Sequence, residues 1–211
     1  MYKRFLSLSS VLVLLSASCG IVAAEASDPA SWSDFVDYHR SSGAFGTFAA
    51  EGVTQGMWEG IEAGQNYTAT YTLQAAEDGR SIRAAHRMET ESGEVISIGV
   101  GLQYWDERSK SIKSSYSGFD QGNAFSGFST LKSFDPAANL IEWEYTETSH
   151  GKTTRYVQRV EQVSSNRKVQ VAKKAEGGDE WKEELTRVQA KQSETRTMPV
   201  LQRLLLRGRR K

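Results

Sequence analysis

The chain has 211 residues, with 26 Lys and Arg against 26 Asp and Glu, three prolines and one cysteine. These values exclude collagen-like, fully disordered and polytopic membrane proteins. A single cysteine provides neither a disulfide framework nor a cysteine-ligated zinc site. The balanced charge disfavours a protein that works mainly by neutralising phosphates, so nucleic acid is not an expected partner. Length and composition therefore predict one globular domain.

Residues 1–26 have the anatomy of a secretory signal peptide. Lys3 and Arg4 precede an apolar run that is too short to span a bilayer, and small residues follow it. We expect export, with cleavage after Ala24 or Ala26, and therefore a secreted or periplasmic protein. The alternative is a membrane-anchored lipoprotein, because residues 15–20 form an imperfect lipobox in which Cys19 would carry the lipid.

Residues 27–42 contain the one good helical window ahead of the strands. Trp32, Phe35 and Val36 recur there at helical spacing, and Asp28 is a suitable N-cap. We expect a short N-terminal helix that serves as a lid or plug.

Residues 43–191 have the pattern of successive antiparallel strands. Runs of roughly 8 to 12 residues rich in Thr, Val, Ile, Tyr and Phe alternate with short turn clusters, which predicts about ten strands. In four of these strands the apolar residues occupy every second position and should share a buried face. These positions are Tyr67, Ala69, Tyr71 and Leu73; Ile82, Ala84, His86 and Met88; Ile96, Ile98, Val100, Leu102 and Tyr104; and Ile141, Trp143 and Tyr145.

An open meander of this kind would leave two unpaired strand edges. Closure removes them, so we predict an all-β fold, a closed up-and-down antiparallel barrel of about ten strands with a short N-terminal helix. A β-sandwich is the alternative.

Short motifs add a family resemblance. The segment Gly56-Met57-Trp58-Glu59-Gly60, the run Tyr104-Trp105-Asp106 and Arg187 in the last strand resemble lipocalin-like (calycin) barrels, and among them secreted bacterial barrels of unknown function. The resemblance implies that Arg187 packs over Trp58 and closes one end of the barrel. Nitrobindin-like barrels are also similar, but they bind haem through a late histidine. No histidine follows His150 here, so haem is not expected.

The inward-facing aromatic residues are the candidate ligand site. A wall of rings with hydroxyl tips suits a small hydrophobic or amphipathic molecule. The predicted lining residues are Tyr67, Tyr71, His86, Tyr104, Tyr116, Trp143 and Tyr145. One alternative is a filled barrel that acts as an envelope interaction protein. A second is a barrel enzyme using His86, which would need another polar residue within hydrogen-bond reach.

Motifs for other chemistry are weak. Gly127-Phe128-Ser129 lies in a strand pattern rather than at a nucleophile elbow, and Gly99 and Gly101 lie inside a strand, where they ease close packing. Glu142 and Glu144 alternate with apolar residues and should face solvent. We therefore expect no metal and no cofactor, and the enzyme reading is the less favoured one.

Residues 192–211 form a basic tail. Arginines and Lys211 outnumber the acids there, and Val200, Leu201, Leu204 and Leu205 recur at helical spacing. We expect a solvated terminus, with contact to an anionic envelope surface as the alternative.

Overall fold

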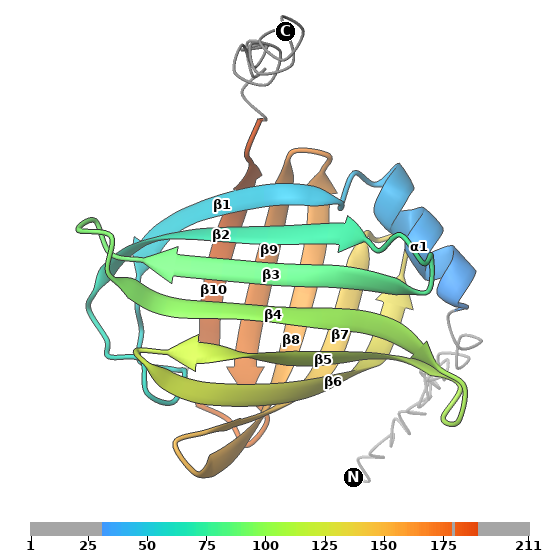
Figure 1. Ribbon diagram of the computed structural model, residues 1–211. Coiled ribbons are helices and arrows are strands. Elements are labelled where there is room, and N and C mark those ends of the chain that lie inside the picture. Colours follow the sequence, from blue (N-terminus) through green and yellow to red (C-terminus); the bar gives the residue numbers. More distant parts are fainter. Residues whose placement is uncertain (1–30, 179, 190–211) are drawn as a thin grey trace, which may run out of the picture.

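The computed structural model describes residues 31–178 and 180–189. Within these ranges the chain forms one helix followed by ten strands that close into a barrel (Figure 1). The elements are α1 (Trp32–Ser41), β1 (Gly46–Val53), β2 (Asn66–Ala75), β3 (Ser81–Glu89), β4 (Val95–Asp106), β5 (Ser111–Asp120), β6 (Asn123–Asp135), β7 (Leu140–Ser149), β8 (Lys152–Ser164), β9 (Arg167–Lys174) and β10 (Glu180–Arg187). The predicted signal segment with Cys19, and the basic tail, lie outside the described residues.

Each strand pairs antiparallel with the next along the chain, and β10 pairs with β1. This order confirms the predicted up-and-down barrel and excludes the sandwich. Two of the tight turns are stabilised by the aspartates that end the preceding strands. The Asp135 carboxylate accepts hydrogen bonds from the N–H groups of Ala137 and Ala138, and Asp106 accepts one from Arg108 N–H.

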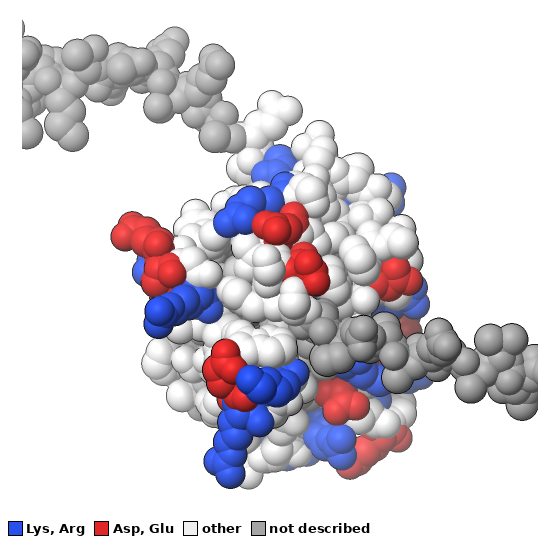
Figure 2. Space-filling model, turned by 90° about the vertical axis from the view of Figure 1, so that its right-hand side faces the viewer, with Lys and Arg blue, Asp and Glu red and all other residues white. Residues whose placement is uncertain are grey.

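Helix α1 lies across one end of the barrel (Figure 1). Ser31 is its N-cap, and the Ser31 hydroxyl accepts a hydrogen bond from Asp34 N–H; the predicted cap Asp28 lies outside the described residues. Phe35 is fully buried against the rings of Phe134 and Trp143. Positively and negatively charged side chains lie next to one another on this end of the molecule (Figure 2).

The loop between β1 and β2 lies at the opposite end (Figure 1). Its Trp58 packs on Tyr156 and Trp181, with ring centres 4.6 and 6.1 Å apart. Gly60 has φ +84°, and any side chain there would collide with the imidazole of His150. The positive φ at Gly60 therefore favours glycine at the point where this loop meets the β7–β8 turn.

Strand β4 corrects one prediction. Its apolar residues Ile98, Val100 and Leu102 are 38, 62 and 42% exposed and face outward, and Tyr104 shares their side of the strand. The inner face instead carries Gly99 and Gly101. A side chain at either position would collide with Tyr116, so these glycines make room inside the barrel for large rings from β5. The pairing of β3 with β4 shifts register at Met88 and Glu89, which leaves Ile96 as the extra, buried residue.

Candidate ligand-binding cavity

The barrel encloses a cavity of about 270 Å³ that extends from α1 to the β1–β2 loop. Its wall combines rings with polar side chains along its length: Gln162 and Lys168 lie near α1, and Asp120 and Glu147 lie toward the far end. The wall includes Tyr38, His39, Phe48, Leu73, Ile141, Trp143 and Leu185; Gln103, Ser114, Ser129, Gln158, Gln162, Lys168 and Gln170; and Trp58, Tyr71, His86, Ser97, Tyr116, Asp120, Phe125, Tyr145, Glu147 and Trp181.

Five of the seven predicted lining residues do line this cavity, from β2, β3, β5 and β7. They are Tyr71, His86, Tyr116, Trp143 and Tyr145. Tyr67 is inward and buried but lies behind the wall, in a cluster with Ile61 and Met88. Tyr104 does not line the cavity because β4 presents glycines, rather than its apolar residues, to the interior.

His86 belongs to a continuous hydrogen-bonded chain along the wall. Its Nδ1 lies 2.6 Å from the Tyr116 hydroxyl, and its Nε2 lies 2.6 Å from the Ser97 hydroxyl. Ser97 in turn donates to Asp120 Oδ1 at 2.5 Å. With Asp120 ionised, the donors run from Tyr116 through His86 and Ser97 to the carboxylate. Both imidazole nitrogens are therefore used by protein partners, and burial lowers the pKa of His86 to about 4, which keeps the ring neutral at physiological pH.

Two carboxyl groups face the cavity, Asp120 at the end of this chain and Glu147 beyond it. Asp120 and Glu147 are 3 and 5% exposed, and burial raises the pKa of both, that of Glu147 to about 7. Tyr145 donates to Glu147 Oε2 at 2.6 Å, but Glu147 Oε1 is buried without a hydrogen-bond partner. This end of the cavity therefore holds a polar atom that a hydrogen-bonding group of a bound molecule would satisfy.

A third buried carboxyl, Glu183, is fully engaged. It accepts hydrogen bonds from Tyr67 at 2.7 Å and from Gln170 at 2.8 Å. Burial, together with the Glu183 charge, raises the pKa of Tyr67 and of Tyr71. These hydrogen bonds join β2, β9 and β10 behind the cavity wall. Tyr67 therefore stabilises the fold and does not line the cavity.

The predicted contact between Trp58 and Arg187 is not formed. Arg187 lies near α1, with its guanidinium 4.7 Å from the centre of the Phe48 ring and hydrogen bonds to the carbonyls of Ser165 and Gly43. Trp58 lies at the other end of the barrel. Because β1 and β10 run antiparallel, the end of β10 meets the start of β1 rather than the loop that follows it. Arg187 still joins the first and last strands, but through Phe48.

Several polar groups of the cavity were missed by the sequence analysis. Glu147 continues the alternation of Trp143 and Tyr145, so its inward position was predictable in principle. Neither Asp120 nor Lys168 continues an alternation of apolar residues that would have predicted its inward position. Among the described residues, no three histidine, cysteine or acidic side chains are grouped so that they could hold a metal ion.

No protein-family model matches the sequence, and no curated protein is significantly similar to it. Within the described part of the chain, no helix is both long and apolar enough to cross a membrane.

Proposed function

We propose that this protein binds a small hydrophobic or amphipathic molecule inside the barrel. The observation that carries the proposal is the cavity of about 270 Å³, walled by Tyr71, Trp143 and other rings, with α1 at one end of the barrel and the β1–β2 loop at the other. Concave sites with mostly apolar walls and a few polar groups are typical of small-molecule binding. At about 30 Å³ per water molecule, the space suits a ligand of on the order of ten non-hydrogen atoms.

The open interior weighs against the filled-barrel alternative, in which the aromatic side chains would occupy this space. The enzyme alternative required another polar residue near His86, and Ser97 and Tyr116 both lie within hydrogen-bond distance of it. However, in this donor order Nδ1 accepts from Tyr116 and Nε2–H donates to Ser97, so His86 directs no free lone pair at a ligand and does not activate the Ser97 hydroxyl. Binding without chemistry is therefore the better supported function.

A lipocalin-like relationship and an extracytoplasmic location are part of the same proposal. The closed up-and-down barrel with one short helix is consistent with a lipocalin-like fold. Export rests on the sequence of residues 1–26. N-terminal sequencing of the processed protein should begin near Glu25 or Ser27, or at a lipidated Cys19, and an intact Met1 on cytosolic protein would contradict export.

Binding can be tested with a small environment-sensitive dye of about ten non-hydrogen atoms, such as 2-naphthol, which matches the size of the cavity. We expect about one dye per chain, with quenching of tryptophan fluorescence, and Trp143→Ala should weaken binding by about 1 to 3 kcal/mol through loss of apolar contact. Ser129→Phe places a ring inside the cavity and should abolish binding.

Ser126→Phe is the matched control, because Ser126 faces outward on the same strand. Equal dye binding by the Ser129 and Ser126 variants would show that the dye does not enter the barrel. Failure of a broad panel of apolar ligands to bind would contradict the proposed function.

A further inference from the structure

The interior contains a lysine without an acidic partner. Lys168, on β9, is 9% exposed, and it lines the cavity near α1. Its Nζ donates to the carbonyl oxygen of Ala44 at 2.7 Å and lies 3.8 Å from the centre of the Phe48 ring. Among the residues that the structure describes, Lys168 takes part in none of the ion pairs.

Among the described residues no acidic side chain pairs with Lys168, and the inward carboxyl of the neighbouring strand β10, Glu183, is held by Tyr67 and Gln170. Its strand neighbours are Gln162 on β8 and Leu185 on β10. The titratable neighbours are Arg187, a second cation over the same Phe48 ring, and His39 of α1, whose pKa burial lowers to about 4. Burial and the Arg187 charge together lower the pKa of Lys168 to about 7. A buried ammonium with no counter-ion is unfavourable, so this side chain gains free energy from any anion placed beside it.

We propose that the cavity binds a small organic carboxylate with an apolar body, and that its carboxylate pairs with Lys168 at the α1 end. This inference rests on the proposed function, because it specifies the class of ligand that the same cavity takes. An ammonium group has three N–H donors, and only one has a partner here, so two remain for a carboxylate. Leu73, Ile141 and Trp143 provide an apolar surface for the rest of the ligand.

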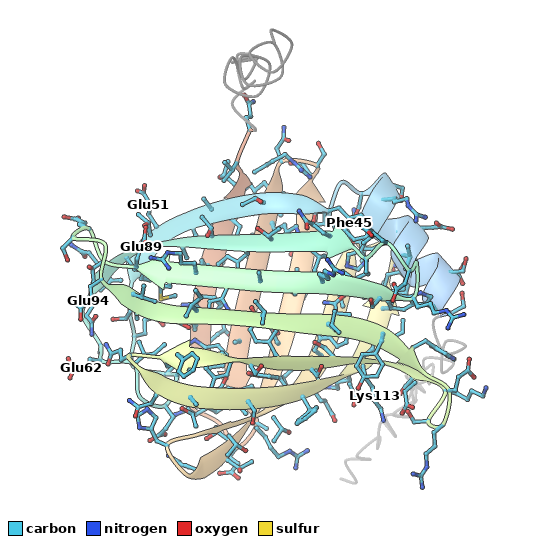
Figure 3. The ribbon with its side chains drawn as sticks, viewed as in Figure 1. Phe45, Glu51, Glu62, Glu89, Glu94 and Lys113 are labelled. Atoms are coloured by element: carbon cyan, nitrogen blue, oxygen red, sulfur yellow. The ribbon has the colours of Figure 1, made fainter. Side chains whose placement is uncertain are left out.

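The opposite end of the cavity disfavours an anion. Asp120 and Glu147 face the cavity there, so a carboxylate would meet a like charge wherever either group is ionised, which for Glu147 is above about pH 7. Glu51, Glu62, Glu89 and Glu94 also lie around that end of the barrel (Figure 3). The charges therefore orient an amphipathic anion with its head toward α1.

Calorimetric titration of the full chain with octanoate, 1-octanol and octylamine at about pH 6 tests the inference. Octanoate has about ten non-hydrogen atoms, which matches the cavity. We expect octanoate to bind at least tenfold more tightly than octanol. Lys168→Met should abolish this preference while octanol still binds, and Lys168→Arg should retain it.

The pH dependence of wild-type binding gives a second measurement, which does not require the Met variant to fold. Because an anion favours protonated Lys168, the Kd for octanoate should rise above about pH 7, by up to tenfold per pH unit, while that for octanol stays constant. The carboxyl of Glu147 titrates in the same pH range. The rise in Kd can therefore be assigned to Lys168 only if it persists in Glu147→Gln.

The outcomes separate the two proposals. If octanoate and octanol bind equally to the wild type, or if octylamine binds most tightly, the anion site is refuted and ligand binding stands. If Lys168→Met is folded and keeps the octanoate preference, the anion site is also refuted. If none of the three probes, nor the dye, binds the wild type, the proposed function itself fails.

Discussion

Replacing Glu147 with glutamine removes a carboxyl group that the barrel holds in an unfavourable place. Glu147 is 5% exposed, its Oε1 lacks a hydrogen-bond partner, and the charge of Asp120 opposes its ionisation. Glutamine has nearly the same shape and offers a carbonyl oxygen to the Tyr145 hydroxyl, but it never ionises. The pH-dependent part of the stability difference therefore isolates the free energy of burying this charge, because any effect of the new amide N–H₂ group does not change with pH.

The magnitude follows from the two pKa values. The Glu147 pKa is 4.5 in the unfolded chain and about 7 in the barrel, which corresponds to about 3 kcal/mol at 1.4 kcal/mol per pH unit. Because folding raises the pKa, the unfavourable contribution is absent below about pH 4.5 and complete above about pH 7. Wild-type stability should fall relative to Glu147→Gln as pH rises through this window.

Urea unfolding of both proteins, at several pH values between about 4.5 and 7.5, measures the difference. Glu144→Gln is the matched control, because Glu144 is exposed on the outer face of the same strand. We expect the stability advantage of Glu147→Gln to grow by about 3 kcal/mol across the window, and that of Glu144→Gln to stay near zero. A constant difference for Glu147→Gln would refute the burial argument.

Three further substitutions test the packing by urea unfolding. Arg187→Ala should lower stability by about 1 to 3 kcal/mol through loss of the Phe48 contact and two hydrogen bonds. In a background where Trp58 is the one remaining tryptophan, its emission should not change, and a large change would contradict the placement of Arg187 and Trp58 at opposite ends of the barrel. Gly127→Ala should destabilise by about 1 to 3 kcal/mol, because the new methyl group would collide with the Tyr145 ring, and a neutral effect would show that the ring moves freely. Phe35→Ala should cost about 3 to 5 kcal/mol, and a loss under about 1 kcal/mol would mean that α1 contributes little to the fold.

The sequence predicted strand number, closure and the inner faces of β2 and β7 because alternation of apolar and polar residues is strong there. Alternation failed in β4, where Val100 faces out and Gly99 faces in. The interior of the barrel holds a cavity and large aromatic rings. Wall positions opposite those rings therefore need small residues more than they need apolar ones.

The polar part of the site was harder to predict for a related reason. A dry core would exclude Gln162, Lys168 and Gln170, but a cavity wall accommodates them, so hydrophobicity does not mark the inner face of β8 and β9. The chain from Tyr116 to Asp120 also depends on register between three strands, which determines which side chains meet.

The unequal pairing of β1 with its two neighbours gives the barrel wall one weak line. β1 pairs with β2 from Gly46 to Val53, whereas its register with β10 covers only Phe48 with Arg187 and Ala49 with Thr186. Local opening begins where backbone pairing is sparse. Thermal fluctuations should therefore separate β1 from β10 before they separate any other strand pair. Phe48 and Leu185, which flank this line, also line the cavity. A ligand would then enter the cavity through the opening between β1 and β10, and neither α1 nor the β1–β2 loop would need to move.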